Sequence, residues 1–89
     1  MLEYDKKKLG LILKDARLSI GLSQREVSLR VGYTSSQFIS NIERGVSVAS
    51  LKLLAQLVRM YKIKPDKVAN VILDSQKQLL RKNFRASNL

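Results

Sequence analysis

With 89 residues the chain can support one small domain, and a domain of this size buries only a little over about 60% of the surface that its unfolded chain exposes. It has no cysteine and no histidine, which excludes disulfides and the usual zinc sites, and its short apolar runs exclude a membrane span and argue against a signal peptide. The absence of cysteine is compatible with a reducing cytoplasm, where we expect the protein. The 17 basic and 7 acidic residues give a net charge of +10, so we expect a polyanionic partner.

Residues 6–20 are predicted to form the first helix, with Asp5 as its N-cap and Gly21 after its end. Gly10 should weaken this helix by about 1 kcal/mol relative to alanine, so the helix needs support from tertiary packing. The apolar residues that share one face are Leu9, Ile12, Leu13 and Ala16. The lysines expected to face water include Lys7, Lys8 and Lys14.

Residues 23–45 are predicted to form two short helices joined by a tight turn. Ser23 and Glu26 have the spacing of a capping box, in which each side chain bonds the backbone amide of the other residue, so a helix begins there. Val27 and Val31 give this helix a narrow apolar stripe. Gly32 follows, where a residue beyond the helix end can turn left-handed without a steric penalty.

The second helix of the pair follows three hydroxyl-bearing residues, 34–36, each of which can act as its cap. It should bury Ile39 and Ile42 and stop at Gly45. Two helices of two to three turns, separated by a short turn that contains glycine, describe a helix-turn-helix unit.

The exposed face of this second helix, predicted over residues 35–44, carries side chains that can read DNA bases. Amide side chains can bond bidentately to adenine, hydroxyls can donate or accept, and arginine can fork onto guanine or a phosphate. The candidates are Ser36, Gln37, Ser40, Asn41 and Arg44. An ordinary polar helix face is the alternative interpretation. Tyr33 and Phe38 are expected to pack over the turn, although Phe38 could touch a thymine methyl group.

A fourth helix is predicted after Gly45, capped by Ser47 or Ser50. The face expected to close the core consists of Leu51, Leu54, Ala55 and Val58. A second apolar stripe, which consists of Leu53, Leu57 and Met60, exceeds what a small core requires. Such surplus apolar surface normally has to be covered by another element or another chain.

A fifth helix should begin at Pro65 and run to about Arg85, with residues 86–89 frayed. Its broad apolar stripe consists of Val68, Val71, Ile72, Leu79, Leu80 and Phe84. Residues 46–89 hold 9 basic and 2 acidic side chains, so much of the positive charge lies outside the helix pair. We expect residues 1–64 to bind DNA and residues 65–89 to dimerise, within one all-α, five-helix domain.

Catalytic chemistry has little support in this sequence. The chain has no histidine base, no cysteine nucleophile, no Gly-rich phosphate loop and no metal-ligand cluster, so we expect neither enzymatic activity nor a cofactor. Most of the seven carboxylates have a capping or pairing role or lie beside a lysine: Glu3, Asp5, Asp15, Glu26, Glu43, Asp66 and Asp74.

The stretch from Gly21 to Gly45 resembles the Cro/repressor type, or XRE type, of helix-turn-helix regulators. The matching residues are Gly21-Leu22-Ser23-Gln24, Val27-Ser28, Gly32 and Ser40-Asn41-Ile42-Glu43-Arg44-Gly45. With flanking helices the resemblance covers about residues 6–62. It departs from the family pattern at Ser28, where alanine is usual, and in a segment from Gly32 to Gly45 that is one residue longer than in the best-known members.

The resemblance implies roles for several residues. Ser36 and Gln37, with Asn41 one turn later, map to positions that touch base edges, and Gln24 maps to a glutamine that meets the DNA backbone. We also expect Ser35 and Arg44 to contact the backbone. Arg17 falls where the family carries an arginine that pairs with the glutamate here at position 43, which would be a structural pair.

The function that follows is a sequence-specific transcriptional regulator, in particular a dimeric repressor that binds an inverted repeat in double-stranded DNA. The main alternative is a DNA-binding antitoxin or the controller of a restriction–modification system, of which an antitoxin would need an acidic protein partner for the basic last helix. A sequence-independent, nucleoid-like binder is a further alternative, although it would not need the polar reading face.

Overall fold

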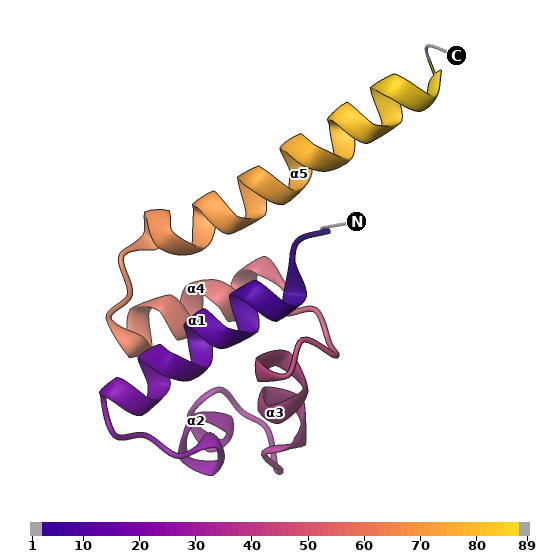
Figure 1. Ribbon diagram of the computed structural model, residues 1–89. Coiled ribbons are helices and arrows are strands. Elements are labelled where there is room, and N and C mark those ends of the chain that lie inside the picture. Colours follow the sequence, from indigo (N-terminus) through magenta and orange to yellow (C-terminus); the bar gives the residue numbers. More distant parts are fainter. Residues whose placement is uncertain (1–2, 88–89) are drawn as a thin grey trace.

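The computed structural model describes residues 3–87, and this part of the chain contains five α-helices and no strand (Figure 1). They are α1 Lys6–Ser19, α2 Gln24–Arg30, α3 Gln37–Glu43, α4 Leu51–Tyr61 and α5 Pro65–Ser87. The predicted all-α, five-helix fold is therefore confirmed. None of these helices is both long and apolar enough to cross a membrane.

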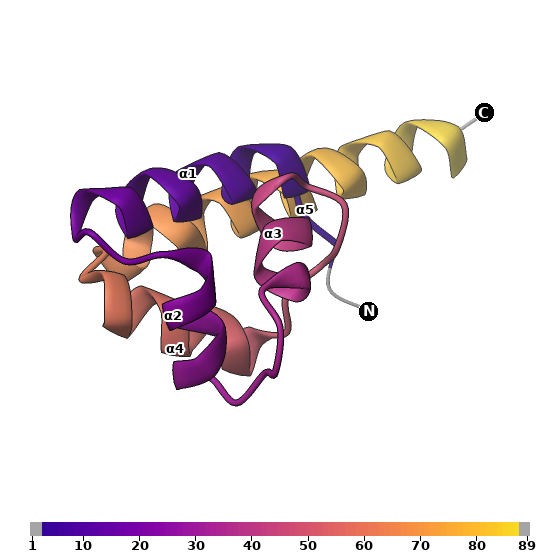
Figure 2. The same cartoon turned by 90° about the horizontal axis from the view of Figure 1, so that it is seen from below.

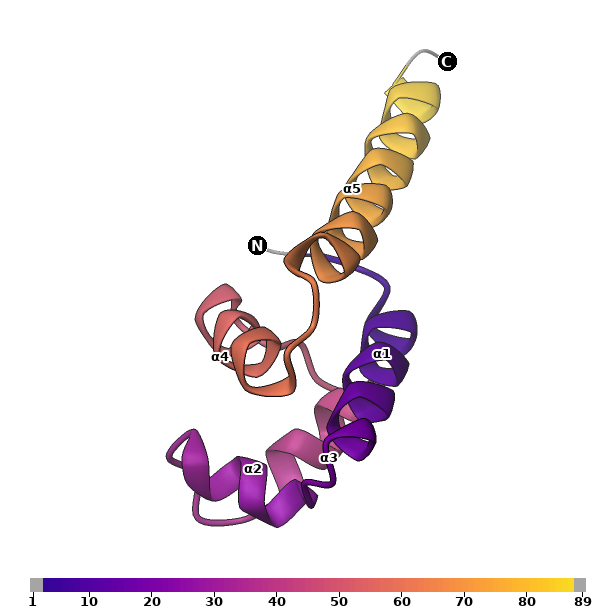
Figure 3. The ribbon, with the colours of Figure 1, turned by 90° about the vertical axis from the view of Figure 1, so that its left-hand side faces the viewer.

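Helix α1 contacts α3, α4 and α5, and α2 packs against α3. Helices α2 and α3 lie on one side of α1 and α5 lies on the other, as Figure 1 shows, and α2 and α3 are in front when the molecule is seen from below (Figure 2). The C-terminal part of α5 projects away from the other helices (Figure 3). This projection makes the molecule elongated, with principal dimensions of 50, 24 and 18 Å.

Every helix contributes to a single hydrophobic core. Its buried members are Leu9, Leu13, Val27, Ile39, Ile42, Ala49, Leu53, Leu54, Leu57, Tyr61, Val68 and Val71. Because this core includes two valines from α5, the beginning of the last helix is part of the same packed unit as the helix pair.

Gly10 lies where α1 crosses the C-terminal end of α3. A Cβ atom added at this position would lie 2.5 Å from the backbone oxygen of Glu43 and 2.6 Å from that of Ile42. Any side chain would therefore force the two helices apart. The glycine that weakens α1 as an isolated helix allows it to approach α3 closely, which supplies the tertiary support that the sequence requires.

Helix α2 begins as predicted. The Ser23 side chain accepts a hydrogen bond from the Glu26 amide at 3.0 Å, and the Glu26 carboxylate accepts one from the Ser23 amide at 3.1 Å. The bond from the Ser23 amide lowers the pKa of Glu26, because it favours the ionised carboxylate.

Helix α3 is shorter than the predicted segment 35–44. It begins at Gln37 because residues 34–36 form bends, and Ser36 stands at the N-cap with no capping bond from its side chain. The Ser35 hydroxyl instead accepts a long bond of 3.4 Å from the Gln37 amide. The turn thus absorbs residues that we expected in the first turn of the helix. The predicted end at Gly45 is correct, and Gly45 has a φ of 74°.

The predicted core face of α4 is correct at Leu54 and in part at half-buried Val58, and wrong at its other two members. Ser50 caps this helix by accepting a bond from the Leu53 amide at 3.1 Å, and the side chains buried are Leu53, Leu54, Leu57 and Tyr61. Leu51 is 63% exposed, and Ala55 is exposed as well. The two stripes have the same helical spacing, so periodicity could not separate them. Tyr61, one turn after Leu57, extends the stripe that the sequence predicts as surplus, and this stripe forms most of the core face.

Helix α5 starts at Pro65 as predicted but continues through Ser87, so the expected fraying of residues 86 and 87 is wrong, and residues 88–89 lie outside the described part. Its beginning is fixed by buried Val68 and Val71. The Ser75 hydroxyl accepts a bond from the Asp5 amide at 2.8 Å, which joins α5 to the start of α1. Further along, Leu80 is 70% exposed.

Candidate nucleic-acid interface

The helix pair is fixed to α1 by a buried ion pair beneath α3. Arg17 donates from Nε to Glu43 Oε2 at 2.7 Å and from Nη2 to Glu43 Oε1 at 2.9 Å, and the two side chains are 7% and 3% exposed. Arg17 Nη1 also donates to the Leu22 carbonyl oxygen at 2.8 Å. The hydrogen-bonded carboxylate raises the pKa of Arg17. This geometry leaves Arg17 no role in reading DNA and makes it a structural anchor for the end of α3.

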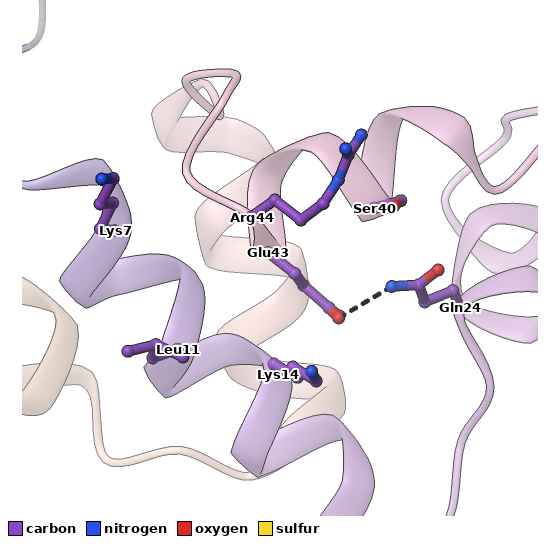
Figure 4. A pocket seen from close by; sticks show the side chains of 7 residues that line it. All are labelled: Lys7, Leu11, Lys14, Gln24, Ser40, Glu43 and Arg44. Carbon is purple, nitrogen blue, oxygen red and sulfur yellow. Dashed lines mark hydrogen bonds between the residues drawn. The ribbon is translucent and has the colours of Figure 1, made fainter.

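Gln24 joins the start of α2 to the same carboxylate. Its Nε2 donates to Glu43 Oε1 at 3.0 Å, and the side chain is half-buried (Figure 4). The resemblance implies a DNA-backbone contact for Gln24, and nothing in the sequence indicates this internal bond. Glu43 therefore receives donors from two helices, so the relative position of α2 and α3 is set by one side chain.

The candidate reading side chains of α3 form a hydrogen-bonded row on its surface. Gln37 Nε2 donates to Asn41 Oδ1 at 2.9 Å, and Arg44 Nη2 donates to the same oxygen at 2.5 Å. Gln37 and Arg44 are exposed, and Asn41 is half-buried. The structure thus brings three of the predicted residues together, one turn apart along a single face.

The serines predicted for the interface lie around this row. Ser36 and Ser40 are half-buried, and Ser35 is exposed in the turn. Tyr33 and Phe38 pack edge to face, with ring centroids 5.1 Å apart and an interplanar angle of 67°. This contact confirms the prediction that the two aromatic side chains cover the turn, and it supports the backbone just before α3.

Two buried hydroxyls near the helix pair have no hydrogen-bond partner within the described residues. They are Ser28 Oγ and Tyr61 Oη. Burial raises the pKa of Tyr61 well above its usual value, and the nearby Glu43 carboxylate raises it further. Ser28 is 1% exposed and stands where the resembling family usually has alanine.

A hollow of about 460 Å³ opens beside α3 at its junction with α1 and the start of α2 (Figure 4). Its lining residues are Lys7, Leu11, Lys14, Gln24, Ser40, Glu43 and Arg44. The sequence placed the two lysines only among water-facing residues, because nothing in the α1 pattern indicates its neighbours. Residues 3–87 contain no group of three or more histidine, cysteine, aspartate or glutamate residues that could hold a metal ion.

The domain is basic, and α3, the second helix of the α2–α3 pair, is anchored from below by the buried Arg17–Glu43 ion pair. Its outer face presents amides, hydroxyls and a guanidinium to solvent. These features define a helix-turn-helix DNA-binding protein. The family model described as helix-turn-helix matches residues 13–68, which is more than half of the chain. The chain therefore belongs to this family, in its XRE type, and is a DNA-binding transcriptional regulator.

Among solved structures, the chain is similar to the restriction-modification controller protein C.AhdI from Aeromonas hydrophila. The two are 28% identical in sequence with a TM-score of 0.64, and the match covers 72% of this chain and 91% of the controller protein. No curated protein matches the chain significantly.

Proposed function

We propose that this regulator is a dimeric repressor that reads an inverted-repeat operator through α3 and its flanks, from Ser35 to Arg44. The observation that supports base reading is the row on α3, in which Gln37 and Asn41 stand one turn apart and share a hydrogen bond at 2.9 Å. Amides placed in this way can exchange their mutual bond for bonds to neighbouring base edges in the major groove. Ser36 and Ser40 extend the reading surface along the helix.

Contacts to the DNA backbone would orient this reading helix. Ser35 precedes the first turn of α3, and Gln24 is the first residue of α2, where unpaired amides and the helix dipole favour a phosphate. Arg44 bonds Asn41 in the free protein, and its exposed guanidinium can turn to a phosphate. These three residues position the helix and do not specify sequence.

The dimer is proposed to form through α5 and the outer face of α4, with a second copy of this chain as the partner. Leu73, Leu80 and Phe84 of α5 are 63%, 70% and 66% exposed, and Leu51 of α4 is 63% exposed. An apolar groove of about 720 Å³ runs between the two helices. Two-fold association would cover this surface on both subunits at once and would present two reading helices to one duplex.

The similarity to C.AhdI favours a second candidate function, in which the chain controls transcription within a restriction–modification system. This candidate uses the same fold and reading helix, and differs in the genes that the operator serves. An antitoxin would require an acidic partner on the basic α5. A sequence-independent binder would leave the α3 row without a role.

Selection of bound sites from random duplex DNA tests the proposal. We expect an inverted repeat whose half-site centres lie about 10 base pairs apart, or a multiple of this spacing, because a two-fold dimer places its reading helices one helical turn apart. Recovery of unrelated sequences would favour the sequence-independent binder. Recovery of asymmetric sites would contradict the dimer. Co-purification of a small acidic protein would favour the antitoxin.

A further inference from the structure

The hollow beside α3 is bounded by segments that approach closely at its edge, because two glycines there leave no side chain between them. Gly10 of α1 approaches the backbone oxygens at the end of α3. A Cβ atom at Gly45 would lie 2.9 Å from Lys7 Cα and 3.0 Å from Lys7 N. The start of α1, which carries Lys7, therefore lies directly against the end of α3 and the residues that follow it.

Three cations surround this hollow without a matching negative charge. Lys7 and Lys14 line it from α1, and Arg44 lines it from the end of α3 (Figure 4). The carboxylate at its base belongs to Glu43, which is 3% exposed and already neutralised by the bidentate bond from Arg17. The remaining lining groups include the polar side chains of Gln24 and Ser40. The hollow thus has the charge of a site for an anion.

The position of the hollow identifies the anion. It adjoins the row of Gln37 and Asn41 through Arg44, so a duplex read by α3 must pass its backbone close to the mouth. Lys7 and Lys14 lie about 10 Å apart along α1, and their flexible stems can bring both ammonium groups to the backbone. Leu11, 59% exposed between them, offers an apolar surface to a deoxyribose.

We infer that Lys7 and Lys14 of α1, together with Arg44, hold backbone phosphates of the strand next to the bases that α3 reads. This inference rests on the proposed function and adds α1 to the DNA-contacting helices α2 and α3. The two lysines contribute affinity that is independent of sequence, since phosphate contacts act by releasing counterions and carry no base information.

Binding of Lys7→Gln and Lys14→Gln to selected and random duplexes, measured over a range of salt concentrations, tests the inference. Each substitution should weaken binding several-fold and equally on both DNAs, and should reduce the slope of log K against log salt by about 0.9. Lys8→Gln is the matched control, because Lys8 is exposed on α1 and does not line the hollow. It removes the same charge and should leave the slope unchanged. Thermal melting confirms that all three variants remain folded.

Equal slopes for Lys8→Gln and the two hollow variants would overturn the inference. This result is distinct from failure of the proposed function, which would appear as loss of preference between selected and random DNA in the unmodified protein.

Free inorganic phosphate is the other anion that the hollow could bind. Titration with inorganic phosphate, followed through the NMR signals of the Gln24 and Ser40 amides, should give no saturable shift. The lysine contacts need the phosphates of a DNA duplex that α3 already binds. Saturable binding of phosphate alone, combined with unaltered DNA binding by Lys14→Gln, would overturn the assignment to DNA.

Discussion

Arg17 and Glu43, separated by 26 positions in the chain, meet through two parallel hydrogen bonds of 2.7 and 2.9 Å beneath α3. The pair joins α1 to the end of α3, and Gln24 adds a third donor to the same carboxylate. Three helices therefore converge on one buried charge, and the orientation of α3 depends on it.

Removal of either member of this pair should destabilise the fold strongly. We expect Arg17→Met and Glu43→Leu each to lower the free energy of unfolding by about 3–5 kcal/mol, because each leaves a buried charge without its partner. The double variant should lose less than the sum of the two. Urea unfolding of the three variants measures this coupling. Small losses that add, each under about 1 kcal/mol, would mean that the pair is solvated in solution.

Ser28→Ala should stabilise the protein by about 1 kcal/mol, because the Ser28 hydroxyl is buried without a hydrogen-bond partner within the described residues, and the substitution removes its desolvation cost. Ser19→Ala is the control. The Ser19 hydroxyl is exposed and donates to the Ala16 carbonyl oxygen at 2.7 Å, so its loss should change stability by less than about 0.5 kcal/mol. A lower melting temperature for Ser28→Ala would show that the hydroxyl is satisfied in solution.

Tyr61 should make stability depend on alkaline pH. Burial raises its pKa in the folded protein, whereas the unfolded chain releases this proton near pH 10. Above that pH the unfolded state binds fewer protons than the folded state, so the free energy of unfolding falls as the pH rises. The contribution of Tyr61 to stability is therefore complete below about pH 10 and is lost as the pH rises toward the pKa of the folded protein. Tyr61→Phe should lack this loss. Unfolding free energies of both proteins that stay parallel from pH 8 to 11 would contradict the prediction.

Gln37→Ala and Asn41→Ala should each weaken binding to the selected operator by about 1–3 kcal/mol and relax the preference at one base position. The salt dependence should remain nearly unchanged, because no phosphate contact is lost. Binding to selected and random duplexes, measured at several salt concentrations, separates these effects. An equal loss on both DNAs from Gln37→Ala would remove Gln37 from the reading residues.

Leu80→Gln combined with Leu73→Gln should convert a micromolar dimer into a monomer without unfolding the domain, since both side chains are exposed on α5. Truncation before Pro65 is a poorer test because it would also remove Val68 and Val71 from the core. Sedimentation equilibrium gives the mass, and circular dichroism confirms the fold. Gln78→Ala, at another exposed position of α5, is the control. A variant that stayed dimeric would place the interface elsewhere.

Local sequence signals predicted the helices and their glycine stops, because caps and left-handed positions act within a few residues. The capping box at Ser23 and the end of α3 at Gly45 are examples. The start of α3 was misplaced because residues 34–36 offer three equivalent hydroxyls, and the choice among them depends on how the turn packs. In α4, two apolar stripes have the same helical spacing, so the sequence does not decide which of them faces the core. The packing of α4 against α1 decides it.

The candidate site was less accessible to such reasoning. The resemblance indicated Arg17 and Glu43, whose ion pair joins elements far apart in the chain. The bond from Gln24 to Glu43 and the lysine-lined hollow had no signal of their own, since both arise only where three helices meet. A helix-propensity scale describes one helix and not its neighbour, so the sequence predicts only that Gly10 weakens α1 and not that it allows α3 to approach.

The contact between Gly10 and the backbone of Glu43 also bears on the kinetics of recognition. Because no side chain separates α1 from α3, the two helices pack backbone against backbone, and we expect their relative placement to be fixed during folding and not at the encounter with DNA. A preorganised surface of this kind associates at a rate set mainly by diffusion and charge. Substitutions on the reading face of α3 should therefore alter the residence time on an operator far more than the rate of arrival.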